Sequence, residues 1–314
     1  MSARVCTWGV AGHRQDCAEH GLTLQQTQGA LALDAPKLGP DRTHTIFAKI
    51  AQPKGDPMND QPHKPLFSLS HAKAVVTGAQ QGIGLAIAVA LAQAGASIVA
   101  NYLDEDTAAS GMQTLSAMGA RVTWVKADLS NSGQIAHLFE QADAVGGLDI
   151  LVNNAAIFPR ADFLELTETM WDQTLAVNLK APFLCTQQAA KRMIAQGRGG
   201  SIINITSGAA FRSSPRAAHY VSSKAGLVGL TRASAMALAS HQIRVNAVAP
   251  GITDTAQPRQ GMSEDDIFAA AALVPLGRIA SASDIAPIVQ FLASDGAAHV
   301  TGQTWHVNGG QYLA

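Results

Sequence analysis

Tyr220 and Lys224 stand four residues apart in the stretch HYVSSKAG, residues 219–226. On a helix that spacing places two side chains on one face, with about 5–6 Å between their Cβ atoms. A free tyrosine titrates near pH 10, and each unit by which its pKa falls requires about 1.4 kcal/mol of preference for the phenolate. A fixed positive charge nearby supplies such a preference. The pair is therefore a candidate proton-transfer site, and an ordinary surface pair on a solvated helix is the alternative.

The composition bounds the classes of protein to which the chain can belong. Of its 314 residues, 47% are hydrophobic and 14% are charged, which suits helices packed on a buried sheet. The formal charge of −1 gives no basic surface for nucleic acid, and no apolar run is long enough to span a bilayer. Three scattered cysteines are too few for a disulfide framework or a zinc cage. We therefore expect a cytoplasmic protein with no metal, nucleic-acid or membrane partner.

Two regions of the chain differ in pattern. Residues 1–65 are rich in Gln, His, Pro and Asp without a sustained apolar period, so we expect a disordered or loosely attached N-terminal extension. Over residues 66–314, short apolar segments alternate with helical stretches. The expected strands include 73–78, 97–102, 121–128, 148–156, 200–207 and 243–251, and the expected helices include 84–95, 107–119, 135–147 and 219–239. Strands this apolar must be covered on both faces, which predicts a single α/β domain with a doubly wound, Rossmann-type parallel sheet and helices on both faces.

The stretch TGAQQGIG, residues 77–84, lies between the first expected strand and the first expected helix. Gly78 permits a tight turn, Gly82 lets the backbone approach a phosphate, and Gly84 lets the helix pack closely. The positive end of the helix then faces a pyrophosphate. In this strand–turn–helix context the turn predicts dinucleotide binding.

Further motifs follow in a fixed order along the chain. Together with the glycine turn they resemble the short-chain dehydrogenase/reductase family, from about Lys73 to the end of the chain. The motifs are NNAA (153–156), VNLKAPF (177–183), INITS (203–207), HYVSSK (219–224) and PGITDT (250–255). The resemblance implies an NAD(P)-dependent enzyme that interconverts a secondary alcohol and its ketone by hydride transfer.

The resemblance also implies four catalytic residues. Tyr220 is the expected general acid/base. Lys224 is expected to lower the Tyr220 pKa and to hold the nicotinamide ribose, and Ser207 to bind the substrate oxygen where negative charge develops. Asn178 resembles the family's helix-kinking asparagine, which holds a water that links Lys224 to solvent. An alternative is a cofactor-binding sensor or scaffold without turnover, which has no need for all four residues.

The expected cofactor contacts follow the same motifs. They are Gly78, Gln81, Gly82, Ile83, Gly84, Tyr102, Leu103, Asp128, Leu129, Asn154, Ala155, Tyr220, Lys224, Pro250, Gly251, Ile252, Thr253 and Thr255. Of these, Tyr102 and Leu103 end the second expected strand, which faces the adenine ribose in such folds. The following residues 104–106 are acidic, and the sequence places no Lys or Arg here to pair a 2′-phosphate. We therefore expect NAD, with NADP as the alternative.

The substrate is the least determined part of the prediction. The loops expected to select it are 208–218 and 254–278, where Arg212, Arg216 and Arg259 are candidates for contact with an anionic substrate or are ordinary solvated charges. Similarity to family members leaves two classes open. One is a sugar, polyol or hydroxyacyl alcohol, and the other is a 3-oxoacyl thioester reduced with NADPH.

The C-terminal stretch HVTGQTWHVNGGQYLA, residues 299–314, carries several large apolar side chains. Chain ends usually fray unless something holds them. We expect a final strand at the sheet edge packed against a copy of itself, and the family resemblance implies a second interface through long helices. Two such two-fold interfaces predict a homotetramer, and completion of the monomer's own sheet is the alternative.

Overall fold

The computed structural model of the chain describes residues 67–212, 215–259 and 262–313. The expected extension, residues 1–65, lies outside the described residues. Within them, no helix has the length and apolar character needed to cross a membrane. The described residues also contain no group of three or more potential metal-ligating side chains.

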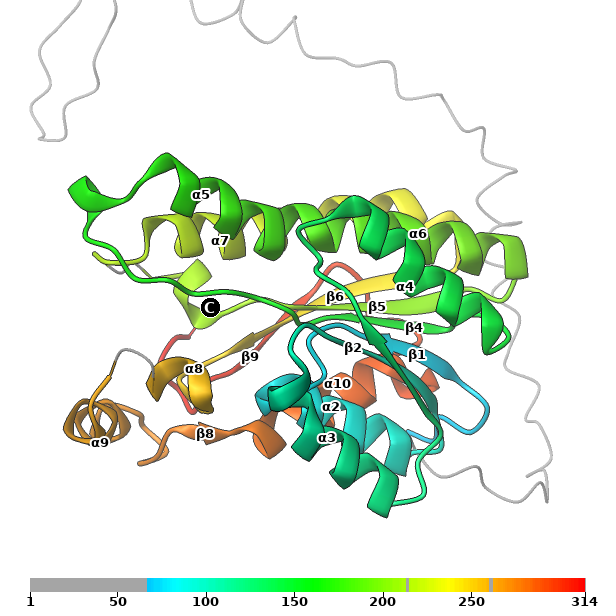
Figure 1. Cartoon of the computed structure of the whole chain (residues 1–314), viewed down its shortest axis with the longest axis horizontal. Coiled ribbons are helices and arrows are strands. Elements are labelled where there is room, and N and C mark those ends of the chain that lie inside the picture. Colours follow the sequence, from blue (N-terminus) through cyan, green and yellow to red (C-terminus); the bar gives the residue numbers. More distant parts are fainter. Residues whose placement is uncertain (1–66, 213–214, 260–261, 314) are drawn as a thin grey trace, which may run out of the picture. The chain divides into compact units, whose positions relative to one another are not determined.

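Seven parallel strands form the central sheet (Figure 1). They are β1 (Lys73–Val76), β2 (Ser97–Tyr102), β3 (Val122–Lys126), β4 (Ile150–Asn153), β5 (Gly200–Ile205), β6 (Ile243–Pro250) and β9 (Thr304–Val307), in the order β3-β2-β1-β4-β5-β6-β9. The predicted Rossmann-type parallel sheet is confirmed. The strand order runs in opposite directions on the two sides of the β1/β4 boundary, and ligands of such folds bind beyond the carboxyl ends of the strands at that point.

Helices cover both faces of the sheet, as Figure 1 shows. On one face lie α2 (Gly82–Gln93), α3 (Glu105–Ala117) and α10 (Ala282–Ala293), and on the other α4 (Ser132–Ala144), α6 (Ala181–Gln196) and α7 (Ala218–Leu238). Successive residues of β1 feed the two cores, because Val75 belongs to one buried cluster while Ala74 and Val76 belong to the other. This alternation explains why the strands read as continuously apolar.

The helices begin a few residues before their expected starts. Polar side chains explain two of these differences, because they cap the first turns: Asp104 accepts a hydrogen bond from Thr107 N at the start of α3, and Asn131 accepts from Gly133 N and Gln134 N at the start of α4. Each cap satisfies backbone N–H groups that lack a partner within the helix. The spacing of the apolar residues alone does not indicate that these first turns belong to the helices.

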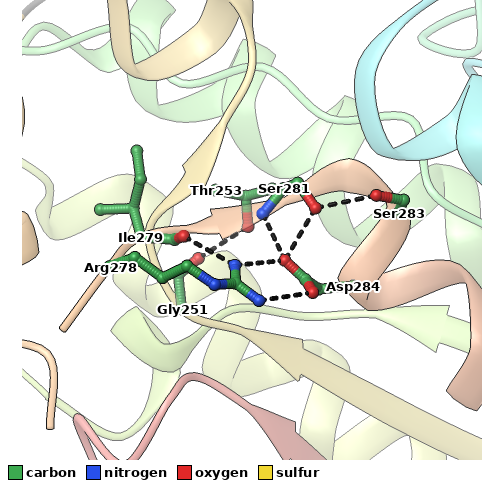
Figure 2. Close-up of polar contacts among 7 residues, drawn as sticks. All are labelled: Gly251, Thr253, Arg278, Ile279, Ser281, Ser283 and Asp284. Carbon is green, nitrogen blue, oxygen red and sulfur yellow. Dashed lines mark hydrogen bonds and ion pairs between the residues drawn. The ribbon is translucent and has the colours of Figure 1, made fainter. Parts of the chain in front are cut away.

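A separate segment leaves the end of β6 and returns to the sheet at α10. It contains β7 (Thr253–Asp254), α8 (Ala256–Arg259), α9 (Glu264–Ala272) and β8 (Ala280–Ser281), and β7 pairs with β8 in parallel. Figure 2 shows how its return is fixed: Arg278 binds Asp284 through both guanidinium Nη atoms at 2.6 and 2.8 Å, and Asp284 also accepts from Ser281 N at 2.7 Å. These hydrogen bonds hold the pKa of the Asp284 carboxyl well below its usual range. We call residues 253–281 the outer segment.

Candidate active site

The glycine turn adopts a backbone that other residues would strain. Gly78 and Gly82 have φ angles of +60° and +55°, in the left-handed region that favours glycine. A Cβ atom at Gly84 would lie 2.1 Å from the Gly78 carbonyl oxygen, so a side chain there would force the turn and the helix apart. Asn101 fixes the turn from β2, because its Oδ1 accepts a hydrogen bond from Gly78 N at 3.1 Å. The turn is thus built for close approach of a ligand to its backbone.

A cavity of about 1120 Å³ extends from this turn along the carboxyl ends of the strands. Its lining includes Gly78, Gln81, Gly82, Ile83, Gly84, Leu103, Asp128, Leu129, Asn154, Ala155, Pro250, Gly251, Ile252, Thr253 and Thr255 at the end nearer the turn, and Ser207, Tyr220 and Lys224 at the other. The structure therefore brings together nearly all of the residues expected to contact a cofactor or to act in catalysis. Two of the expected residues, Tyr102 and Asn178, do not line the cavity.

Tyr102 packs instead against the sheet. Its ring meets Trp124 edge-on, with 6.1 Å between the ring centroids, and only the next residue, Leu103, lines the cavity. Leu103 is held by its backbone N–H, which donates to the Gln80 Oε1 at 3.3 Å. Tyr102 therefore stays a predicted cofactor residue, with its ring packed on Trp124 and not in the lining of the cavity.

A positively charged side chain, Lys126, lies beside Tyr102, and the sequence did not predict it there. Lys126 is the register partner of Tyr102 on the neighbouring strand. Its Nζ lies 2.8 Å from the Glu105 Oε1, and this contact raises the Lys126 pKa. Lys126 lies far from Tyr102 and Glu105 in the sequence, and the pairing of β2 with β3 brings it close to them. The acidic residues that follow β2 thus have a positive partner.

Tyr220 lies in the wall of the cavity, near the end expected to hold the substrate. The residue is buried, with 8% of its surface exposed. Burial raises the pKa of the phenol above its ordinary value, and side-chain hydrogen bonds with Ser207 and Gln257 oppose that rise. The expected lowering of this pKa is therefore not what the protein's own groups produce, because desolvation of the phenolate outweighs the hydrogen bonds that favour it. Ser207 is in place as expected, within hydrogen-bonding reach of the acid/base candidate.

Lys224 lies below the Tyr220 ring on the same helix face. Its Nζ is 5.8 Å from the ring centroid and donates to the Ile205 carbonyl oxygen at 2.9 Å. Burial lowers the pKa of this ammonium to about 8. The spacing in the sequence therefore produces the juxtaposition that it predicts.

Asn178 lies one layer behind the cavity and is fully buried. It sits in a π-helical turn, Ala176–Lys180, which joins α5 (Glu168–Leu175) to α6. Its side chain accepts from Ile157 N at 2.9 Å and donates to the Ile157 carbonyl oxygen at 2.9 Å and to Ser223 Oγ at 3.2 Å. Ser223 Oγ in turn donates to the Tyr220 carbonyl oxygen at 2.7 Å. The side chain thus joins the segment after β4 to α7, as a helix-interrupting residue in that place would.

Several residues of the substrate end were not found from the sequence. Phe158 stacks on Tyr220 with 4.1 Å between ring centroids, and Arg160, Gln173 and Gln257 also line the cavity. They belong to three different segments that meet only in the folded chain. The sequence contained one indication of these residues: Gln257 lies in the loop 254–278, which was expected to select the substrate.

Comparison with known proteins identifies the relatives of this site. Residues 78–311 match the family model described as enoyl-(acyl carrier protein) reductase. The chain belongs to the short-chain dehydrogenase/reductase family. NAD or NADP is the cofactor of this family, and the glycine turn and the cavity beside it fit such a dinucleotide.

Two curated relatives illustrate the range of activities within the family. The chain is 41% identical over 247 residues to the 2-dehydro-3-deoxy-D-gluconate 5-dehydrogenase of Escherichia coli, which covers 78% of this chain and 96% of the relative. It is 38% identical over 242 residues to the 3-oxoacyl-[acyl-carrier-protein] reductase FabG of Staphylococcus epidermidis, which covers 76% of this chain and 98% of the relative.

Solved structures give the same picture. A putative short-chain alcohol dehydrogenase from Sinorhizobium meliloti superposes with a TM-score of 0.75 at 37% identity, covering 79% of this chain and 98% of that one. A putative NAD(P)-dependent gluconate 5-dehydrogenase from Beutenbergia cavernae, with bound NADP, superposes with a TM-score of 0.74 at 37% identity, covering 78% and 98%. The family assignment therefore rests on sequence and structure together.

Proposed function

We propose that the protein is an alcohol dehydrogenase/ketone reductase that acts on a secondary alcohol of the sugar, polyol or hydroxyacyl type, with Tyr220 as general acid/base. One observation carries the proposal: Ser207 and the buried Tyr220 line the same cavity within reach of each other, and this cavity continues to the glycine turn. A proton donor and a second polar group thus share the end of the cavity that a nicotinamide-bound substrate would occupy. Residues 66–314 would form the catalytic domain.

The roles of the side chains follow from their positions. When bound, the nicotinamide cofactor supplies or accepts the hydride. The Tyr220 hydroxyl donates its proton to the carbonyl oxygen in reduction, or removes one from the alcohol in oxidation, and Ser207 donates a hydrogen bond to the same oxygen. Gly78, Gly82 and Gly84 would hold the pyrophosphate at the start of α2.

Lys224 and Asn178 support this proton transfer from behind. Below about pH 8 the Lys224 ammonium is charged, and a positive charge in a buried site favours the phenolate form of the neighbouring tyrosine. The same ammonium would hold the nicotinamide ribose. Asn178 positions the helix that carries both residues, through its bonds to Ile157 and Ser223.

The alternatives are a 3-oxoacyl-thioester reductase that uses NADPH and a dinucleotide-binding scaffold without turnover. The curated relatives include both a sugar-acid dehydrogenase and an acyl-carrier-protein reductase, so relatedness alone favours neither substrate class. For the cofactor we propose a preference for NAD, because acidic residues 104–106 follow β2 and Glu105 occupies the nearest cation, Lys126. We also propose a cytoplasmic homotetramer, in which the edge strand β9 takes part.

The test is turnover of a substrate panel by the purified full chain. Oxidation of polyols and aldonates with NAD or NADP, and reduction of acetoacetyl-CoA with NADH or NADPH, would be followed at 340 nm, where the reduced cofactor absorbs. We expect activity with at least one secondary alcohol or ketone and its loss in Tyr220→Phe. Cofactor binding without any turnover across the panel would favour the scaffold. Light scattering tests the assembly, where a mass near the 32.6 kDa of one chain would contradict the tetramer.

A further inference from the structure

The substrate end of the cavity is positively charged. The charged residues that line the whole cavity are Asp128, Arg160, Arg212, Arg216 and Lys224. Asp128 follows β3, whereas Arg160 lies in the segment after β4, and Arg212 and Arg216 lie between Ser207 and Tyr220 in the sequence. Among the described residues that line this substrate end, none is an aspartate or a glutamate. Such a concave surface raises the local concentration of anions and disfavours cationic ligands.

We infer that the substrate carries a carboxylate on a short hydroxylated chain, and that Arg160 and Arg212 bind this carboxylate. The inference rests on the proposed oxidoreductase function and narrows its substrate class to sugar acids. It is argued from three observations: the position of Arg160 beside the ring that covers Tyr220, the arginines that line the cavity, and the amide side chains in the same lining.

Arg160 is held one aromatic ring away from the acid/base. Its Cζ lies 5.2 Å from the centroid of the Phe158 ring, and that ring stacks on Tyr220 at 4.1 Å with an angle of 28° between the planes. A guanidinium over an aromatic face is oriented as well as attracted, because both groups are flat. The half-buried Arg160 is thus placed where it can contact a group on the substrate several bonds from the reacting carbon.

The four arginines near this end differ in their acidic partners. Arg259 is bound to Asp254 and Glu264 within the outer segment and does not line the cavity, so the earlier expectation of a substrate contact is not supported for it. Arg216 lies 3.1 Å from Asp162, and both are exposed. Arg212 follows the Ser207 loop and lines the cavity. Arg212 is exposed as well, whereas the half-buried Arg160 is stacked on the ring that covers Tyr220, and we assign the substrate carboxylate to these two cavity-lining arginines by their position.

Asp266 at the start of α9 is the carboxylate that competes for Arg160. Arg160 contributes to the lowered pKa of Asp266, but hydrogen bonds from Ser263 are the larger cause. Asp266 is already engaged there, accepting from Ser263 N at 2.9 Å and from Ser263 Oγ at 2.8 Å. A substrate carboxylate, which binds an arginine through two parallel N–H···O bonds, is the stronger partner for the guanidinium.

Two amide side chains in the lining suit hydroxyl groups on the substrate. Gln173 from α5 and Gln257 from α8 both line the cavity, and each amide offers donors and an acceptor. Gln257 also hydrogen-bonds to Tyr220, so it lies next to the reacting oxygen. The large exposed apolar residues of the outer segment, Phe268, Leu273 and Leu276, do not line the cavity. These amides suit hydroxyl groups of the substrate, and they lie in a lining that also contains apolar side chains such as Phe158, Val177 and Met262.

The experiment compares two ligands that differ at one carbon. D-Gluconate and sorbitol share a six-carbon hydroxylated chain, but gluconate carries a carboxylate where sorbitol carries a hydroxymethyl group. Calorimetry would measure binding of each to the full chain loaded with NADH, so that the alcohol cannot be oxidised. We expect gluconate to bind at least tenfold more tightly than sorbitol. Arg160→Gln and Arg212→Gln should each weaken gluconate binding about tenfold and leave sorbitol unchanged, since hydrogen bonds to charged groups are strong.

Arg121→Gln is the matched control, because Arg121 precedes β3 at the opposite edge of the sheet and donates to the Gly95 carbonyl oxygen. Arg121→Gln should leave the affinity for both gluconate and sorbitol unchanged. An unchanged NADH affinity in all variants would show that they fold. Gluconate that does not bind, equal binding of the two ligands, or arginine variants that affect both ligands alike would overturn the inference. So would loss of acetoacetyl-CoA reduction in these variants with gluconate binding intact, which would assign the arginines to a thioester. Each of these results leaves the oxidoreductase proposal standing if Tyr220-dependent turnover of a neutral polyol or ketone persists.

Discussion

The two walls of the cavity are built differently. The inner wall carries Ser207, Tyr220 and Lys224 on the end of β5 and on α7, with Asn178 behind them, and its groups are tied by buried hydrogen bonds to the sheet and to neighbouring helices. The outer wall includes residues 255–258 of the outer segment. Elsewhere in that segment Phe268 is 79% exposed, and Arg259 pairs with Asp254 and Glu264, each five positions away. Proton transfer requires fixed distances, whereas substrate choice requires only a suitable lining. The contrast explains how one scaffold can keep its chemistry while its outer wall varies.

The largest expected effect is on the inner wall. Tyr220→Phe removes the proton that the chemistry needs while keeping the ring that stacks on Phe158, so turnover should fall by about 10²–10⁴-fold or more. NADH binding should stay within about twofold. The chain has 3 tyrosines, and Tyr102→Phe is the control, because that ring packs on Trp124 outside the cavity. A Tyr220→Phe variant that keeps more than about a tenth of the activity would assign proton transfer to another group.

The second effect is on stability. Lys224 has a pKa of about 8 in the folded chain and about 10.5 when unfolded, so between these values the unfolded state holds a proton that the folded state lacks. Stability conferred at this residue therefore rises with pH through that window and is lowest below pH 8. Lys224→Met lacks this pH dependence. The free energy of unfolding of the wild type should therefore rise by about 2 kcal/mol relative to that of the variant between pH 7 and pH 9.5. Urea unfolding at both pH values measures it, and parallel changes in the two proteins would refute a buried, easily deprotonated lysine.

The inner wall was also the part that the sequence predicted best, for a physical reason. The signals for Gly78, Gly82 and Gly84, and for Tyr220 and Lys224, are short-range: a required backbone conformation and a helical spacing. Asn178 and Ser207 came only with the family resemblance. Other residues that line the substrate end gave no such signal. Phe158, Arg160, Gln173 and Gln257 come from segments that only tertiary packing brings together.

Register explains a second omission. Lys126 meets Glu105 and Tyr102 because β3 pairs with β2, and nothing local to residues 102–106 indicates that pairing. The sequence-based expectation of NAD therefore considered only the negative charges of residues 104–106 and left out the positive charge of Lys126. A similar argument applies to the Tyr220 pKa, since the depth of burial that raises it depends on the whole cavity wall.

The third prediction concerns the base of the outer segment. Asp284→Asn should weaken the contacts with Arg278 and Ser281 that Figure 2 shows, and lower stability by about 1 kcal/mol, since this ion pair is partly exposed. We expect a higher KM with little change in kcat, because the inner wall is untouched. The lowered pKa of Asp284 stabilises the fold above the unfolded carboxyl pKa, and that contribution is lost as the pH falls further. The variant should therefore lose less stability than wild type on acidification, and an equal loss would contradict the assignment.

The smallest expected effect tests the end of the cavity near β2, where an exposed ion pair lies beside the end of the strand. Glu105 pairs with Lys126 there, and this strand end faces the adenine ribose in such folds, so Glu105→Gln should free a cation for a 2′-phosphate. Because exposed ion pairs contribute little, we expect NADPH to bind about two- to fivefold more tightly and NADH to change less. Quenching of protein fluorescence during titration with each nucleotide measures both affinities. Glu140→Gln, an exposed glutamate on α4 beside His137, is the control. Unchanged NADPH affinity, or an equal gain for NADH, would show that Lys126 does not reach the nucleotide and that the acidic residues after β2 set the preference alone.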